Sequence, residues 1–416
     1  MNRKNMKYWI LPLVGLVMLQ SCFKNDEEYW DESASIRLEN TIQDYRSVLV
    51  NSEYGWVMDF YPDQTYTEGG YVYTMKFEND GNVAVGYELA NPTDTRTSMY
   101  SIGGGEGPVL TFDTYNEFMH HFGTPDIVNY EGLGGDYEFV LQRRSDAGDY
   151  VKTLGRKSKN HMPMYKLTMP ASDYYAAVDE MKDMILNPYI LVSAGETSYS
   201  FAKESSVAAY IDEDEDIYPF VYTNEGLRFC YGMGDVNAKD SVFVLSENKD
   251  QLIGVNNPNV VITGDNFGLY LQTAGTDKLV FTFTDMPQAW QDFCNKLNQQ
   301  LVAYDANYPL GRVGLSFDSS WNMYCLYVEA GNRKLTYGLN VEAPSGTNQL
   351  VISKMENQLT NSNCDIYIGQ GVTAIAELAE AICGEYTFSS PNTLTYQDVA
   401  LTSGEIDVKC TKESSL

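Results

Sequence analysis

Residues 71–89 read YVYTMKFENDGNVAVGYEL, and this stretch decides the fold class that we expect. In 71–77 and again in 83–89, aromatic and aliphatic residues occupy every second position, which is the period of a strand with one face in a core. Between the two runs lies Asn79-Asp80-Gly81-Asn82, in which Gly81 can adopt the positive φ of a tight hairpin turn. The stretch therefore predicts a β-hairpin.

The same period of two continues on both sides of this hairpin. Eight antiparallel strands with mostly short connections form an up-and-down meander, and closing it into a barrel removes the exposed edges. We expect a lipocalin-like barrel, since eight strands can enclose one small ligand, although a sandwich fits the same pattern. The eight strand-like runs lie at 55–61, 70–77, 82–89, 97–103, 109–114, 137–144, 150–157 and 161–169.

Helices are expected where apolar residues recur at three- and four-residue steps. A capping box of Thr114 and Glu117 predicts a short helix to about Phe122, and Ser172 is the expected cap of another helix that ends near Leu186. The order helix, strand, hairpin after residue 285 repeats the order at 35–89, which suggests a distant internal duplication. The other expected helices cover about 35–50, the segment after Pro287 and about 373–383.

The expected fold class is thus mainly β with a few helices, a β-rich α+β protein. A chain of this length is too long for one hydrophobic core. We expect a signal segment at 1–21, an acidic tether at 22–34, an N-terminal β-meander domain with flanking helices at 35–190, a middle β-rich region at 191–284 and a C-terminal helix-plus-β domain at 285–416.

The N-terminus has the pattern of a bacterial lipoprotein signal. Arg3, Lys4 and Lys7 precede an apolar run at 8–19 that is too short to span a bilayer. The sequence Leu19-Gln20-Ser21-Cys22 then places a small residue before a cysteine. We expect cleavage before Cys22 and lipid attachment to it, with palmitate-type acyl chains as the membrane anchor.

The charge is typical of an extracellular protein. Asp26, Glu27 and Glu28 follow Cys22 closely, and this acidic cluster resembles the surface-export signal of Bacteroidetes-type lipoproteins. The resemblance favours the outer face of the outer membrane over its periplasmic face. Removing the three basic residues of the signal segment lowers the net charge from −29 to −32. Such a chain repels nucleic acid, so no nucleic-acid partner is expected.

No motif indicates catalysis or a metal centre. The sequence contains no HExxH, no GxSxG and no CxxC motif, so we predict no catalytic residues, no metal site and no cofactor. The acidic run at 212–216 lacks the glycine and the final glutamate of a calcium loop, and the glycines of 103–107 read as a strand connection. The six cysteines beyond Cys22 are expected to be mostly buried thiols.

Several segments resemble a family of uncharacterised Bacteroidetes surface lipoproteins. The resemblance rests on Gly69-Gly70-Tyr71, on 107–116, on 134–139 and on Leu154-Gly155-Arg156-Lys157. It implies an accessory component of a SusC/SusD-type, TonB-dependent nutrient uptake system. We therefore expect a non-enzymatic surface protein that binds a glycan or peptide. Two alternatives stay open: a structural or protein–protein interaction lipoprotein of the outer membrane, and a hydrolase that uses carboxylates.

Overall fold

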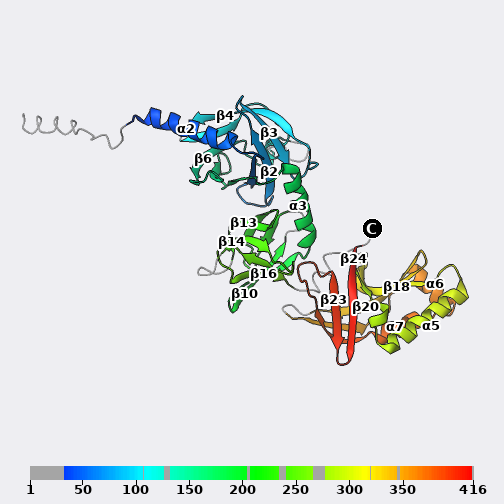
Figure 1. Cartoon of the computed structure of the whole chain (residues 1–416). Coiled ribbons are helices and arrows are strands. Elements are labelled where there is room, and N and C mark those ends of the chain that lie inside the picture. The colour runs from blue at the N-terminus through cyan, green and yellow to red at the C-terminus, as the bar shows by residue number, and fades with distance from the viewer. Residues whose placement is uncertain are drawn as a thin grey trace, which may run out of the picture.

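The computed structural model describes residues 32–105, 107–125, 132–203, 207–233, 240–265, 277–318, 320–343 and 347–414. Cys22, the expected signal segment and most of the expected tether lie outside the described residues. The described residues form three closed eight-stranded antiparallel barrels that follow one another along the chain (Figure 1). This confirms the β-rich fold class and the N-terminal eight-stranded barrel. The division into domains at 190 and 284 stays a prediction.

Barrel 1 closes by pairing its first and last strands, where Val57 lies opposite Tyr165. Its strands match the eight runs read from the sequence within a few residues. They are β1 (Trp56–Phe60), β2 (Tyr71–Phe77), β3 (Asn82–Tyr87), β4 (Arg96–Gly104), β5 (Pro108–Phe112), β6 (Glu138–Arg144), β7 (Tyr150–Gly155) and β8 (Met164–Lys166).

Side chains fill the interior of barrel 1. Helix α2 (Ala34–Val50) covers one end, where the Trp56 indole donates to the Leu49 carbonyl at 2.9 Å. At the other end of β1, the Phe122 ring stacks on Phe60 with centroids 5.8 Å apart. The barrel is therefore a packed core, and the outer surfaces remain as places for a ligand. Six interior side chains that are 1% exposed or less come from β1 and β2: Trp56, Met58, Phe60, Tyr73, Met75 and Phe77.

Barrel 2 and barrel 3 repeat the meander. Barrel 2 closes where its last strand pairs with its first, with Ile262 opposite Val192. Barrel 3 closes in the same way, with Lys412 opposite Leu279. Barrel 2 comprises β9 (Tyr189–Ala194), β10 (Thr197–Lys203), β11 (Ala209–Ile211), β12 (Ile217–Tyr222), β13 (Gly226–Met233), β14 (Asp240–Leu245), β15 (Leu252–Gly254) and β16 (Val260–Gly264). Barrel 3 comprises β17 (Asp277–Phe281), β18 (Leu310–Asp318), β19 (Met323–Ala330), β20 (Arg333–Glu342), β21 (Gln349–Lys354), β22 (Gly384–Ser389), β23 (Asp398–Ser403) and β24 (Ile406–Ser414).

Three helices pack on barrel 3: α5 (Gln288–Tyr304), α6 (Ser362–Gly369) and α7 (Ala374–Ala381). The segments expected after Pro287 and at 373–383 are confirmed as α5 and α7, whereas α6 was not expected. Strand β17 precedes α5, so barrel 3 begins one strand before the helix, unlike barrel 1. The internal duplication stays a prediction. Among the described residues, no helix combines the length and apolar character needed to cross a membrane.

The prediction of a short helix at 114–122 was wrong. The segment forms turns and one 3-10 turn, η1 (His121–Gly123). Thr114 does not cap it, because its hydroxyl accepts from the Met99 amide of β4 at 2.9 Å. Instead the Asn116 side chain accepts from the Phe118 amide at 3.1 Å, which stabilises a turn rather than a helix.

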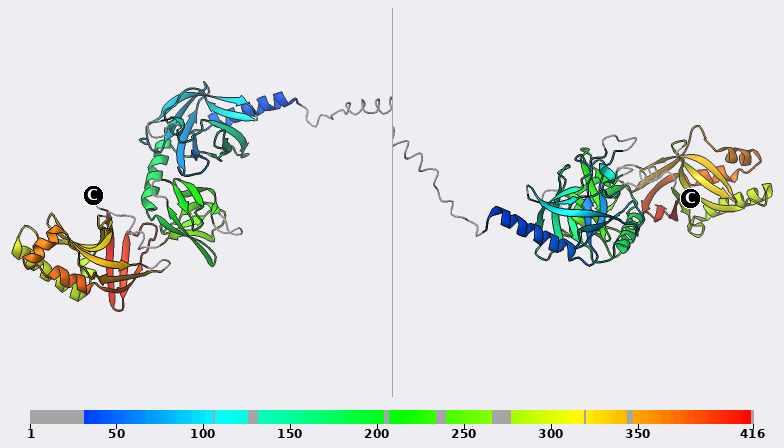
Figure 2. Two further views of the ribbon diagram at one scale, coloured as in Figure 1. Left: turned by 180° about the vertical axis from the view of Figure 1, so that it is seen from behind. Right: turned by 90° about the horizontal axis from the view of Figure 1, so that it is seen from above.

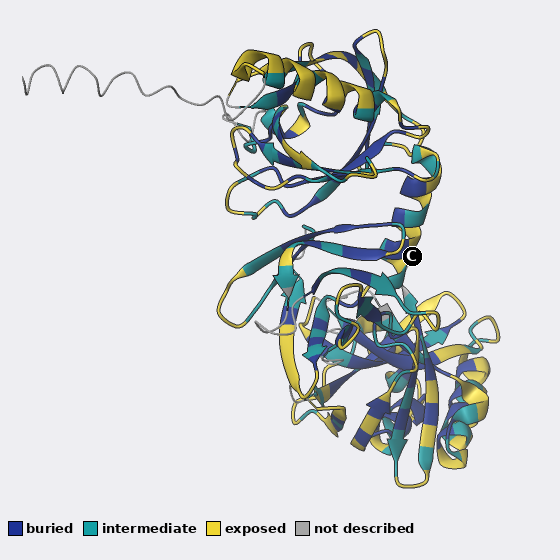
Figure 3. Cartoon of the chain, turned by 60° about the vertical axis from the view of Figure 1, so that its left-hand side comes forward, coloured by how far each residue is buried: buried dark blue, intermediate teal, exposed yellow. Residues whose placement is uncertain are grey.

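Helix α3 (Ala171–Met184) connects barrel 1 to barrel 2 and packs on both (Figures 1 and 2). It begins one residue before the expected cap, because Pro170 occupies the N-cap position and Ser172 lies inside the helix. The Tyr175 hydroxyl accepts from the Thr74 amide of β2 at 3.0 Å. Further along, Met181 is buried in the cluster that includes barrel 2. One face of α3 is therefore buried against the two barrels, and its buried residues are dark blue in Figure 3.

The outer faces of β1 and β2 pack directly against β12 of barrel 2. Val57 and Val72 share one apolar cluster with Val221. Gly70 makes the close approach possible, because a Cβ there would lie 2.2 Å from the Phe220 carbonyl oxygen. A glycine is thus required where the two barrels touch.

Barrel 3 contacts barrel 2 through the loop 390–397. Leu394 is fully buried in the barrel 2 cluster. Its carbonyl accepts from the Asn187 amide at 2.8 Å, and the Gly264 amide donates to the Thr393 hydroxyl at 3.0 Å. One residue of barrel 3 thereby completes the core of barrel 2.

Candidate functional site

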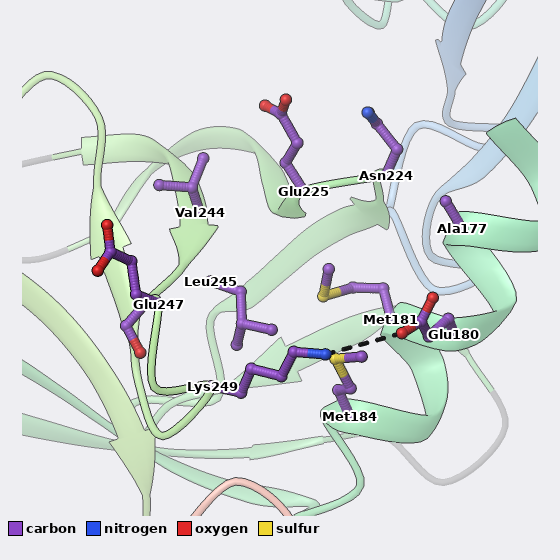
Figure 4. Close-up of a pocket in the computed structure, with 11 residues that line it drawn as sticks. Ala177, Glu180, Met181, Met184, Asn224, Glu225, Val244, Leu245, Glu247 and Lys249 are labelled. Carbon is purple, nitrogen blue, oxygen red and sulfur yellow. Dashed lines mark ion pairs between the residues drawn. The ribbon is translucent and has the colours of Figure 1, made fainter. Parts of the chain in front are cut away.

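A pocket of about 540 Å³ lies between α3 and barrel 2 (Figure 4). We call it the α3 pocket. Three segments form it: α3, the turn between β12 and β13, and the end of β14 with the turn that follows. Its lining residues are Ala177, Glu180, Met181, Met184, Asn224, Glu225, Val244, Leu245, Ser246, Glu247 and Lys249.

The base of the α3 pocket is apolar. Met181 and Met184 lie three positions apart on α3 and so share one helix face, and Leu245 faces them from the end of β14 (Figure 4). Methionine side chains are flexible and polarizable, so they adapt to ligands of different shape. The base can therefore take up an apolar side chain.

The edge of the α3 pocket is charged. Glu225 and Glu247 are exposed, and neither takes part in an ion pair within the described part of the chain. Lys249 reaches across to Glu180 on α3, with Nζ 3.8 Å from Oε1 (Figure 4). The three carboxylates and one ammonium give the edge a net negative charge, which favours a cationic group above an apolar base.

The two turns that carry these charges are held by their own side chains. The Thr223 hydroxyl accepts from the Gly226 amide at 3.0 Å and fixes the turn that bears Glu225. The Ser246 hydroxyl donates to Asp250 at 2.7 Å and shapes the turn that bears Lys249. The Lys249 carbonyl in turn accepts from the Asn392 side chain at 2.6 Å. Barrel 3 thus holds one edge of the pocket in place.

A second, more polar cavity of about 240 Å³ lies between barrels 1 and 2. We call it the inter-barrel cavity. Its lining residues are Asp59, Tyr61, Tyr150, Lys152, His161, Pro163, Tyr165, Arg228, Phe229, Cys230, Ser241 and Val242.

A buried ion pair forms one wall of the inter-barrel cavity. Arg228 donates to both carboxylate oxygens of Asp59, from Nε at 2.6 Å and from Nη2 at 2.7 Å. The guanidinium also lies over the Tyr165 ring, 3.8 Å from its centroid. Burial raises the pKa of the Asp59 carboxyl, and Arg228 opposes part of that rise. The pair joins β1 of barrel 1 to β13 of barrel 2.

Other ionisable groups of this cavity are also affected by burial. Burial raises the pKa of the Cys230 thiol to about 11, so the thiol is neutral at pH 7. Burial, followed by the nearby Lys152 ammonium, lowers the pKa of His161. The Tyr61 hydroxyl is buried and has no hydrogen-bond partner among the described residues.

Of the three histidines in the sequence, His161 alone lines one of these two cavities. The His120 ring stacks on the Tyr137 ring with centroids 4.7 Å apart. Among the described residues, no cluster could hold a metal ion. Asp212 accepts from the Asp216 amide at 2.9 Å, so the acidic run closes its own turn. The six described cysteines are free thiols and four are buried, as expected.

Sequence reasoning named none of the α3 pocket residues as a site. Met181 lies in the helix that was expected from Ser172 to about Leu186, but the facing turns lie more than 40 positions away along the chain. The spacing of residues carries no signal for such a contact. Only the packing of α3 on barrel 2 brings them together.

The chain matches a family profile over most of its length. The family described as "Domain of unknown function (DUF4302)" matches residues 26–323, which includes both cavities and ends at the first residue of β19. No protein with a curated description matches the chain.

One solved structure with low similarity is the isotype 1 transferrin binding protein B of serogroup B Neisseria meningitidis. The two chains are 10% identical and superpose with a TM-score of 0.14. The match covers 82% of this chain and 64% of that chain, so this chain spans less than two thirds of that protein's length. Similarity at this level carries no argument about fold or ligand.

Proposed function

The chain belongs to the DUF4302 family, whose function is unknown, and from its own geometry we propose that it is a non-enzymatic binding protein. It captures a ligand in the α3 pocket, at the cell surface, for a TonB-dependent uptake system of the SusC/SusD type. The observation that carries this proposal is the α3 pocket itself, with its apolar base of methionine and leucine side chains and its unpaired carboxylates.

The same pocket favours a peptide with basic and apolar side chains over a glycan. None of the eleven lining residues is aromatic, whereas sugar rings pack well on aromatic faces. Glu225 and Glu247 supply charge for a lysine or arginine side chain, and Met184 supplies apolar contact.

Binding without turnover fits the chemistry of the lining residues. They include no histidine and no cysteine, and the one hydroxyl, that of Ser246, is engaged with Asp250. None of the lining residues is thus a histidine that could act as the general base for a serine or cysteine nucleophile. The hydrolase alternative predicts cleaved peptide, which mass spectrometry of the bound sample detects.

Calorimetric titration of the soluble chain after Cys22 tests the proposal. The probes are an acetylated leucyl-lysine amide and its glutamate counterpart. We expect the lysine peptide to bind and the glutamate peptide not to bind, because the pocket edge repels a carboxylate. No measurable binding of the lysine peptide at millimolar concentration would refute the proposal and favour a protein partner.

Matched variants then place the peptide in the pocket. Met184→Lys puts a positive charge on the base and should abolish binding, whereas Met99→Lys, at a methionine that is 52% exposed on barrel 1, should leave binding unchanged. Glu225→Gln or Glu247→Gln should each weaken binding about two- to fivefold. Glu213→Gln, at an exposed acid of the 212–216 turn, should have no effect.

A glycan ligand would require a different surface. Tyr115 and Tyr137, 65% and 44% exposed, flank the ring of His120 on barrel 1. If the ligand is a polysaccharide, affinity electrophoresis should show retardation that Tyr137→Ala removes and Met184→Lys does not. The two ligand classes are thereby separated by one pair of variants.

The anchoring part of the proposal rests on Cys22. Cells given labelled palmitate should incorporate it into the protein, and Cys22→Ser should abolish both the label and membrane retention. Proteinase treatment of intact cells should degrade the protein if it faces outward. Protection from proteinase would place it on the periplasmic face.

A further inference from the structure

The inter-barrel cavity has a positive balance of charge in a strongly acidic protein. The chain carries 57 acidic and 28 basic residues, yet the cavity is lined by one carboxylate, that of Asp59, and by the cations of Arg228 and Lys152. Asp59 and Arg228 neutralise each other at 2.6 and 2.7 Å. Among the described residues, no carboxylate lies within ion-pair distance of Lys152, so its charge is left over.

Several of the remaining lining residues carry side chains that can donate a hydrogen bond. Tyr61, Tyr150, Tyr165, Ser241 and His161 line the same space and carry hydroxyl or imidazole groups. The Tyr61 hydroxyl is the informative one, because its residue is 1% exposed and the hydroxyl lacks a partner among the described residues. A buried hydroxyl without a hydrogen bond costs about 1–3 kcal/mol, and a ligand oxygen in the cavity would remove that cost.

We propose that the inter-barrel cavity binds a small organic carboxylate, held by the Lys152 ammonium and the Tyr61 hydroxyl. This site is separate from the α3 pocket and does not depend on it. The ammonium supplies the countercharge, and the phenol donates to a carboxylate oxygen, which is the stronger kind of hydrogen bond.

Charge and volume define the ligand further. One unpaired cation balances one negative charge, whereas a doubly charged phosphate would leave a buried charge beside Asp59 without a partner. The cavity of about 240 Å³ corresponds to about eight water volumes. A monocarboxylate with a hydroxyl or keto group, such as lactate or pyruvate, fits both limits and offers further acceptors to Tyr150 and Ser241.

Such a ligand would bridge the two barrels. Lys152 and Tyr61 belong to barrel 1, and Ser241 belongs to β14 of barrel 2. Because the ligand contacts both, it stabilises their contact as well as each fold. Binding should therefore raise the temperature at which barrels 1 and 2 unfold.

Calorimetry and thermal unfolding of the full mature chain test this proposal. The probes are acetate, lactate and pyruvate, with acetamide and lactamide as uncharged counterparts of the first two. We expect at least one acid to bind and to raise the melting temperature, and both amides to be inactive. Failure of all three acids at 10 mM, or equal binding of acid and amide, would overturn the proposal.

Three variants locate the site. Lys152→Met should weaken carboxylate binding about tenfold or more, since it removes a charged hydrogen-bond donor. Tyr61→Phe keeps the ring and should weaken binding about three- to tenfold. Lys166→Met removes a lysine of the same intermediate exposure class from β8, outside both cavities, and should leave carboxylate binding unchanged. Full binding by both Lys152→Met and Tyr61→Phe would also overturn the proposal.

Discussion

The ion pair between Asp59 and Arg228 makes the sharpest prediction about how barrels 1 and 2 hold together. The side chains of Asp59 and Arg228 are 2% and 14% exposed, and Arg228 donates two short hydrogen bonds to Asp59. Removing one partner of a buried pair leaves the other charge uncompensated, which costs about 3–5 kcal/mol. We therefore expect Asp59→Leu or Arg228→Met to destabilise the protein by that amount.

Replacing both partners should cost much less. The double variant of Asp59→Leu with Arg228→Met removes both charges from the interface and fills the space with apolar atoms, and such replacements are often neutral or stabilising. We expect its stability to lie within about 1–2 kcal/mol of the wild type. The difference between the sum of the single effects and the double effect measures the coupling.

Differential scanning calorimetry provides the assay, read at the transition that contains barrels 1 and 2. A loss of about 3–5 kcal/mol lowers the melting temperature by on the order of 10 °C for a unit of roughly 200 residues. The exposed pair of Arg96 and Glu117, with N and O 2.8 Å apart, is the control, and Glu117→Gln should cost no more than about 1 kcal/mol. Additive single and double effects at the buried pair would refute the reasoning.

Three other perturbations follow from the same interfaces. Gly70→Ala should separate barrels 1 and 2 and lower the melting temperature, whereas Gly103→Ala, where an added methyl group meets nothing within 4 Å, should not; equal melting temperatures would contradict the close contact. Leu394→Ala should destabilise barrel 2 by about 2–5 kcal/mol, and protease cleavage within barrel 2 rather than barrel 3 would show it. Burial lowers the pKa of Lys412 from 10.5 to about 8, so the folded state binds its proton less tightly than the unfolded state. The contribution of Lys412 to the stability of barrel 3 should therefore rise with pH between about 8 and 10.5, and it opposes the loss above pH 9 that the raised pKa values of buried thiols such as Cys294 cause. Lys412→Met should remove this rise in calorimetric scans across that range, while Lys409→Met, at a lysine whose side chain is 67% exposed, should retain it.

The strands of barrel 1 could be predicted because their signal is local. Apolar residues alternate in 71–77 because one face of that strand lies in the core. Gly81 has the positive φ expected of the hairpin turn. The helix expected at about 35–50 is confirmed as α2, but its residue Ile36 is 50% exposed, because α2 extends beyond the barrel end that it covers (Figure 2). Local periodicity predicts that a helix or strand forms better than it predicts which surface that helix or strand packs against.

Both cavities depended on contacts that no local pattern records. Asp59 and Arg228 are separated by 169 positions, and both belong to strands whose two faces are covered. An alternating pattern cannot distinguish a strand face that meets solvent from one that meets another barrel. The glycines at 69 and 70 were noticed as part of a resemblance, but their physical role is the close approach of barrel 1 to barrel 2.

The position of Leu394 has a consequence for the order in which the protein assembles. The sheet of barrel 2 is closed by residue 264, but its apolar interior is completed by a side chain that emerges only after most of barrel 3 has been synthesised. Until then, barrel 2 is a closed sheet with an unfilled end, so the last two barrels should reach their final stability together. The family match ends at residue 323, and a fragment cut there would lack Leu394 and expose that end to solvent.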